Sequence, residues 1–280
     1  MDIFTYAFVQ NALLGVIIVS IASAIIGTYI VTRRMVFITG GITHACFGGL
    51  GLGYFLGMSP ILMASVFAIS SALGVEWLST RQRVREDSAI AVVWALGMAI
   101  GTLFIFLSPG YVPELTSFLF GNILTITRSD IYLFAAFTII LILFFIIQYR
   151  RIIACAFDRD FARTIGLHER FINYAMTIFI AVGIVLTIRL IGIMLLMSLM
   201  TLPQMIAEIF TNRFKSMMIT SVIVSLICAI GGLLCAYLID VPASATIVIL
   251  LIVIYAIART VKNIMRKRNF KQTFCNNTAI

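Results

Sequence analysis

Residues 131–148 read IYLFAAFTIILILFFIIQ, a run without a single charge, and the chain continues with Tyr149, Arg150 and Arg151. A helix that crosses the hydrocarbon core of a bilayer needs about 20 mostly apolar residues. Basic side chains directly after such a run are typical of the cytoplasmic end of a transmembrane helix. The stretch therefore predicts a membrane-spanning helix that ends at a basic loop.

Apolar runs of this kind recur along almost the whole chain. The 280 residues are 62% hydrophobic and 11% charged, whereas soluble domains average roughly 45–50% apolar and about 25% charged. We therefore expect an all-α fold, a polytopic transmembrane helical bundle in one domain over 1–265, followed by a cytoplasmic tail at 266–280. The best count is nine spans, within eight to ten, near residues 9–32, 37–57, 60–79, 88–108, 131–148, 172–188, 191–210, 217–239 and 243–258. The stretch 114–127 is too short to cross and could be re-entrant or interfacial.

The positive charges indicate how the chain is oriented. If the N-terminus is outside and the spans alternate, 18 of the 20 Lys and Arg residues lie on the cytoplasmic side, and only Arg128 and Arg189 lie elsewhere. The positive-inside rule predicts such a bias. The net charge of +9 is then a topology signal and not a nucleic-acid footprint. We expect a multi-pass protein of the cell (inner) membrane with an external N-terminus and a cytoplasmic C-terminus.

His44 lies within the second predicted span and is one of only two histidines. Ionisable groups inside a bilayer are costly and are functional candidates by default. A neutral imidazole is a good ligand for zinc, iron, nickel or copper. The alternative is a histidine that is hydrogen-bonded to a nearby carbonyl, and the residues alone leave both open. Glu76 and Glu208 lie near the inner ends of their spans, where they can reach the interface.

Other residues in the spans have a packing interpretation beside a functional one. Gly48, Gly49, Gly51 and Gly53 predict a tightly packed helix face, the alternative being a cavity lining. The methionines of the seventh span favour apolar filler over soft-metal ligands. Pro203 predicts a kink in that span. For Arg189 we expect an ion pair with Asp240 or Glu114, or else snorkelling to the interface.

Several motifs together resemble the membrane permease subunits of the zinc/manganese/iron ABC importer family. The resemblance covers about residues 8–265 and keeps the family's order of motifs. These motifs are Arg33-Arg34-Met35-Val36-Phe37, Thr43-His44-Ala45 with the glycines through Gly53, Arg85-Glu86-Asp87-Ser88-Ala89-Ile90, Leu119-Phe120-Gly121-Asn122-Ile123-Leu124, the loop from Asp158 to Leu167, Arg189-x-x-Gly192, Thr201-x-Pro203 and Asp240-x-Pro242.

The resemblance implies a non-catalytic permease for divalent transition-metal ions. It implies a homodimer, separate cytoplasmic ATP-binding subunits and an extracytoplasmic metal-binding protein, with no covalently bound cofactor and no nucleic acid. The chain has no Gly-x-x-x-x-Gly-Lys-Ser/Thr loop, which agrees with ATP being bound by a partner. The residues implied for ATPase coupling are Asp158, Asp160, Phe161, Ala162, Gly166 and Leu167, and those implied for the metal path are His44 as ligand with Thr43, Cys46, Asn122 and Arg189 as further candidates.

One departure from the family pattern concerns the cargo. Many members have Asp four residues before the histidine, where this chain has Gly40, so only the imidazole carries over. The alternatives are therefore an ABC permease for a metal chelate or siderophore and, less favoured, an intramembrane enzyme. The enzyme lacks support, because the sequence has no His-Glu-x-x-His and no Gly-x-Ser-x-Gly motif. An ion-driven transporter would need acidic groups near mid-bilayer, and the predicted spans offer essentially none, because Glu76 and Glu208 lie near the ends of their spans.

Overall fold

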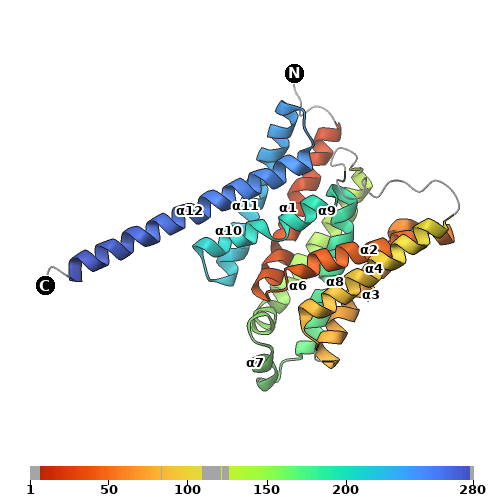
Figure 1. Ribbon diagram of the computed structural model, residues 1–280, viewed down its shortest axis with the longest axis horizontal. Coiled ribbons are helices and arrows are strands. Elements are labelled where there is room, and N and C mark those ends of the chain that lie inside the picture. Colours follow the sequence, from red (N-terminus) through yellow and green to blue (C-terminus); the bar gives the residue numbers. More distant parts are fainter. Residues whose placement is uncertain (1–6, 83, 109–120, 122–125, 278–280) are drawn as a thin grey trace.

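The computed structural model describes residues 7–82, 84–108, 121 and 126–277, and every regular element in this part of the chain is a helix (Figure 1). The helices are α1 (Ala7–Thr32), α2 (Phe37–Leu56), α3 (Pro60–Arg81), α4 (Glu86–Leu107), α6 (Arg128–Phe157), α7 (Arg159–Thr164), α8 (Glu169–Ile191), α9 (Ile193–Leu199), α10 (Leu202–Phe210), α11 (Phe214–Ile239) and α12 (Ala243–Asn277). The expectation of an all-α membrane bundle is confirmed.

Among the described residues, eight segments are long and apolar enough to cross a membrane, and α9 and α10 together form one of them. Two described helices lie outside this set, the short α7 and α2. The helix α2 has 20 residues and is therefore about 30 Å long. Its glycines and threonines lower its hydropathy without shortening it. With α2 included, the count agrees with the expected nine. Of the stretch 114–127, only Gly121, Ile126 and Thr127 are described, so the re-entrant prediction lies mainly outside the described residues.

Glycines let α2 pack against α3 and α4 by direct backbone contact. A Cβ on Gly51 would lie 2.4 Å from the carbonyl oxygen of Gly101 in α4, and one on Gly49 would lie 2.4 Å from that of Met63 in α3. Real Cβ atoms cannot approach so closely, so any larger residue would push the helices apart. The packing interpretation of these glycines is confirmed at these positions, since close backbone approach is what holds helices together in lipid.

The helix ends gather at two opposite ends of the bundle. We call one the basic end, because Arg33, α7 and the start of α4 and α8 lie there, joined by the ion pairs Arg33–Glu86 at 3.0 Å and Arg163–Glu169 at 2.7 Å. In Figure 1, α7 projects from the bundle at this end.

At the opposite end, Arg189 and Asp130 form an ion pair at 2.7 Å. Asp240 is therefore not the partner of Arg189, and Glu114 lies outside the described residues. Asp130 is near enough because α6 begins beside the end of α8, which sequence spacing alone did not reveal.

The predicted kink in the seventh span is a complete break. The helix α9 ends at Leu199 and α10 begins at Leu202, with Pro203 in its first turn. The fully buried Gln204 bridges the break, because its Nε2 donates to the carbonyl oxygens of Leu199 at 3.3 Å and Ser23 at 3.2 Å. Gly27 of α1 makes room for this amide, since a Cβ there would lie 2.4 Å from Nε2.

Candidate functional site

His44 lies on α2 with its ring held against Trp94 of α4. The two rings are parallel within 5° and their centroids are 4.5 Å apart. The imidazole is half-buried, and its Nδ1 is buried without a hydrogen-bond partner among the described residues. The hydrogen-bonded alternative from the sequence therefore finds no support at Nδ1. A buried polar atom normally has a partner, so a ring fixed by stacking with one open nitrogen suits the binding of a ligand.

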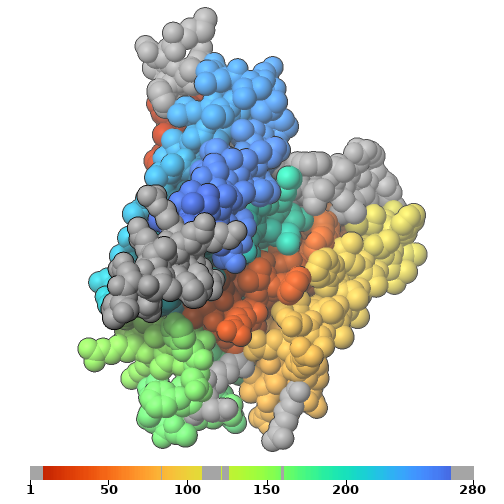
Figure 2. Space-filling model, turned by 60° about the vertical axis from the view of Figure 1, so that its left-hand side comes forward, coloured from red at the N-terminus to blue at the C-terminus, as the bar shows by residue number. Residues whose placement is uncertain are grey.

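Gly40 lies one turn before His44 on the same face of α2. A Cβ at Gly40 would lie 3.1 Å from Cε of Met197 and 3.7 Å from Cζ3 of Trp94. The methyl end of Met197 thus covers the position where many members of the family that the sequence resembles carry a carboxylate. In Figure 2, α2 reaches the surface between the block of α3 and α4 and the block of α9 to α12.

The remaining predicted path residues do not gather around His44. Thr43 is buried, and its hydroxyl has no partner among the described residues. The thiol of Cys46 donates to the carbonyl of Ile42 in its own helix at 3.1 Å. Arg189 lies at the end opposite to the basic end, in its ion pair. Asn122 lies outside the described residues.

Within the part of the chain that the structure describes, no group of three or more His, Cys, Asp or Glu side chains could hold a metal ion together. A closed four-ligand site of the structural zinc type needs such a group. A transport site instead requires cargo to leave, so one or two ligands per chain are compatible with passage but not with permanent storage.

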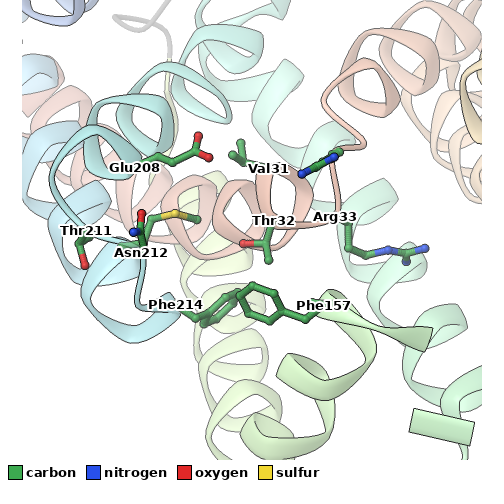
Figure 3. Close-up of a pocket in the computed structure, with 11 residues that line it drawn as sticks. Val31, Thr32, Arg33, Phe157, Glu208, Thr211, Asn212 and Phe214 are labelled. Atoms are coloured by element: carbon green, nitrogen blue, oxygen red, sulfur yellow. The ribbon is translucent and has the colours of Figure 1, made fainter. Parts of the chain in front are cut away.

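A cavity of about 530 Å³ lies at the basic end and does not include His44. Figure 3 shows Phe157 and Phe214 on one side of it and Glu208 on another. Its walls come from the ends of α1 and α6 and from the α10–α11 connection. Glu208 is exposed, as expected for a group that can reach the interface.

The polar groups of the basic end form a connected buried network. Arg33 donates to the hydroxyl of Tyr29 at 2.9 Å and to Glu86 at 3.0 Å. Tyr29 hydrogen-bonds to Asn173 at 3.4 Å, and Asn173 donates to Glu169 at 3.0 Å. Asn173 and Glu169 are almost fully buried. These groups therefore satisfy one another, in contrast to His44.

Electrostatics keeps the guanidinium of Arg33 charged within this network. Burial opposes its charged form, but Tyr29 and the carboxylates of Glu86 and Glu76 outweigh burial and raise the pKa of Arg33. Glu76 is only 2% exposed, so the expectation that it reaches the interface is wrong. The nearby arginine charge offsets part of the cost of burying this carboxylate.

The loop from Asp158 to Leu167 folds as a short helix with both ends capped. Oδ1 of Asp158 accepts from the backbone N–H of Phe161 at 2.9 Å. At the other end, Gly166 has φ +76° and its N–H donates to the carbonyl of Arg163, while the N–H of Leu167 donates to that of Ala162. This pair of bonds is a Schellman motif, which glycine in the left-handed region permits.

The outer face of α7 is apolar and exposed. Phe161 is 57% exposed and Ile165 is 53% exposed, while Ala162 is fully buried against the bundle. Adjacent exposed apolar side chains outside the membrane spans are typical of surfaces that contact another protein or a membrane. The side chain of Asp160 is not described.

Sequence reasoning missed three residues that the structure makes prominent, namely Trp94, Gln204 and Asn173. Each is an amphipathic or polar side chain inside a predicted span. That signal could have singled out Gln204 and Asn173, because polar groups in lipid need partners. Nothing in the sequence identifies Trp94 as the neighbour of His44.

Comparisons with known proteins agree with the fold and the motif order. The sequence model of the ABC 3 transport family matches residues 5–262. A probable metal transport system membrane protein of Chlamydia pneumoniae is 33% identical over 93% of this chain and 91% of its own length. The manganese transport system membrane protein MntC of Listeria monocytogenes is 28% identical over 90% of each chain.

A solved structure is similar over nearly the same range. One chain of the structure described as PsaBC from Streptococcus pneumoniae in complex with Fab superposes with a TM-score of 0.77 at 25% identity, covering 90% of this chain and 91% of that one. The fold therefore defines a multi-pass membrane protein of the ABC transporter class. The chain belongs to the ABC 3 transport family.

Proposed function

We propose that this chain is the permease subunit of an ATP-driven importer for divalent transition-metal ions, namely zinc, manganese or iron, with His44 as a ligand on the path. The observation that supports the proposal best is the open Nδ1 of a half-buried imidazole that Trp94 holds in place. The names of the metal-transport relatives add independent support. The imidazole would bind a passing ion without trapping it, because too few ligands surround it to close a site.

We further propose that α7 is the coupling helix, which docks into a separate cytoplasmic ATPase subunit. Asp158, Gly166 and Leu167 set its length by capping, Ala162 anchors it, and Phe161 offers an apolar contact among charged neighbours that include Asp160. Its ion pair to α8 through Arg163 and Glu169 gives it a firm connection to the spans. The permease itself would then be non-catalytic.

The proposed assembly contains two copies of the permease, ATP-binding subunits and an extracytoplasmic protein that delivers the metal. In the proposed topology the basic end is cytoplasmic, which the positive-inside rule favours, and the N-terminus is external. A membrane-impermeant thiol label on a cysteine placed after Asp240 should react from outside intact cells, and one placed after Lys215 should not. The reverse pattern would overturn the topology.

The central experiment is uptake by the transporter reconstituted in vesicles with its partner subunits. Zinc, manganese, iron and copper isotopes are offered one at a time, with and without ATP. We expect ATP-dependent uptake of at least one metal and its loss in His44→Ala, with unchanged assembly as judged by copurification of the subunits. Uptake at the wild-type rate in His44→Ala would remove this residue from the path.

A second candidate cargo is a metal chelate, for which the metal would arrive with its own ligands. The absence of a multi-residue metal cluster among the described residues favours this candidate. The molecule that copurifies with the extracytoplasmic protein discriminates between the two cargoes. A bare ion supports the first and a chelate the second.

A further inference from the structure

Three side chains from three helices, namely His44 of α2, Trp94 of α4 and Met197 of α9, lie around Gly40. Met197 of α9 places its methyl group 3.1 Å from the Cβ position of Gly40, and the indole of Trp94 lies 3.7 Å from the same point. The same indole stacks on His44. Residues four apart lie on one helical face, roughly 5–6 Å from one another, so the methyl end of Met197 lies beside the position one turn before His44.

The two potential metal ligands here, the His44 imidazole and the Met197 thioether, are borderline and soft donors, respectively. An imidazole and a thioether are ligands that suit zinc and copper, whereas manganese prefers carboxylate and carbonyl oxygens. Met197, Trp94 and His44 are each half-buried, so part of each side chain is open at the surface of the chain. Packing alone does not require sulfur at residue 197, since leucine has a similar volume.

We infer that Met197 is a second cargo ligand beside His44, and that these two donors select zinc or copper over manganese. This inference rests on the proposed import function and deepens it by naming the class of ion. Trp94 acts as a positioning residue, because its indole holds the imidazole and borders the thioether. Thioether contacts are individually weak, so they set preference between metals more than overall affinity.

The test compares matched leucine variants in the reconstituted transporter. Zinc and manganese are offered together as distinguishable isotopes, and the measured quantity is the ratio of their initial uptake rates. Met197→Leu should lower the zinc-to-manganese ratio at least fivefold. Met194→Leu, one turn away on α9 and also half-buried, should leave the ratio unchanged. An unchanged ratio in Met197→Leu, or a wild type that prefers manganese, would overturn the inference.

A variant that adds a hard ligand tests the same metal preference, because Met197→Leu removes a soft one. Gly40→Asp adds a hard oxygen donor one turn from His44, and its Cβ displaces only the flexible end of Met197. Manganese uptake should rise relative to zinc, and a ratio equal to that of the wild type would contradict the inference. If the wild type moves no metal at all, the proposed function itself fails, which is a different outcome.

A second inference rests on the hydrogen bonds of the basic end. They run without interruption from α7 through Glu169 and Asn173 of α8 to Tyr29 and Arg33 at the end of α1. Arg33 then binds Glu86, the first residue of α4. Trp94 follows two turns later on the same rigid helix and contacts His44.

We propose that this series of contacts transmits a displacement of α7 by the ATPase through α4 to Trp94 and His44. Tyr29, Asn173 and Glu169 are positioning residues in this scheme, because none of them touches the cargo. Coupling through packed networks needs direct evidence of coupling and not proximity alone. The relevant quantity is therefore the amount of metal moved per ATP hydrolysed.

Tyr29→Phe removes only the hydroxyl that joins Arg33 to Asn173. We expect ATP hydrolysis to persist and metal per ATP to fall at least threefold. Tyr132→Phe serves as a matched control, because Tyr132 is 71% exposed, and it should change nothing. An unchanged ratio in Tyr29→Phe would overturn the proposal.

Glu169→Gln provides a second variant that preserves side-chain volume. It should also lower metal per ATP. In the double variant Tyr29→Phe/Glu169→Gln, metal moved per ATP should be no lower than in the more severe single variant. Both substitutions interrupt the same series of hydrogen bonds. Fully additive losses would show two independent effects and would contradict transmission along this chain.

Discussion

The α2–α4 interface and the basic end are built on opposite principles. Glycines such as Gly51 and Gly97 bring the backbones of α2 and α4 into contact, with no charged group between them. At the basic end, charged and polar side chains such as Arg33 and Glu169 are buried, but each has hydrogen-bond partners. Backbone contact at glycines holds the first region together, and hydrogen bonds between buried polar side chains hold the second.

The difference separates structural polar groups from functional ones. A buried charge with partners holds helices in place and has little capacity left for another ligand. His44 lies in the nonpolar region instead, and its Nδ1 has no partner among the described residues. His44 is therefore a better candidate for contact with the cargo than the paired charges of the basic end.

The largest expected effect comes from filling the glycine interface. A Cβ on Gly97 would lie 2.4 Å from Cα of Ala45, so Gly97→Ala must separate α2 from α4. We expect a loss of about 3 kcal/mol or more in stability, measured as the thermal denaturation midpoint in detergent. Gly74→Ala is the control, because a Cβ there meets nothing within 4 Å. Equal midpoints for the two variants would refute the role of backbone contact.

Breaking the polar network should have the next largest effect. The Arg33 side chain is 4% exposed, and Arg33→Met removes the donor that binds both Tyr29 and Glu86. Removing one member of a buried ion pair costs about 3–5 kcal/mol, and the lower figure applies because Glu86 is 28% exposed. Partial recovery in Arg33→Lys, measured by the same midpoint, would identify charge as the cause. A neutral Arg33→Met would show that the network contributes no stability.

The ion pair at the opposite end should contribute less. Arg189 is 42% exposed in its pair with Asp130, and exposed pairs are worth about 0–1 kcal/mol. Arg189→Gln should therefore lower the midpoint only slightly. A decrease as large as that of Arg33→Met would mean that exposure does not distinguish the two pairs.

The smallest effect on stability should accompany a clear effect on coupling. Phe161 is more than half exposed on α7, so Phe161→Ala should change the free energy of unfolding by less than about 0.5 kcal/mol. Metal uptake should nevertheless fall, because the proposed ATPase contact is lost, and ATP hydrolysis should become uncoupled from transport. Intact coupling in this variant would remove α7 from the ATPase interface.

The sequence was sufficient for features that depend on local composition. Apolar lengths and flanking charges predicted the spans, Pro203 predicted a kink where α9 and α10 separate, and the glycines of α2 predicted close packing. Each of these signals acts through the helix that carries it. No knowledge of neighbouring helices is needed to interpret them.

Features that depend on helix arrangement could not be predicted. Asp130 pairs with Arg189, Glu76 is buried, and Met197 covers Gly40 because of how separate helices face one another. A spacing of four residues places Gly40 and His44 on one face, but it does not say which helix covers that face. Trp94 became part of the candidate site only through the contact between α2 and α4.

The space that Gly27 leaves for Gln204 has a consequence for how the helices assemble during synthesis. The amide of Gln204 bonds to Ser23 across 181 positions of sequence, so α1 enters the membrane long before its partner in α10 has been synthesised. Until then no side chain of α10 covers Gly27 on α1. The packing of α10 against α1 must therefore wait until the C-terminal third of the chain is made. A chain truncated before Gln204 should lack the hydrogen bond to Ser23.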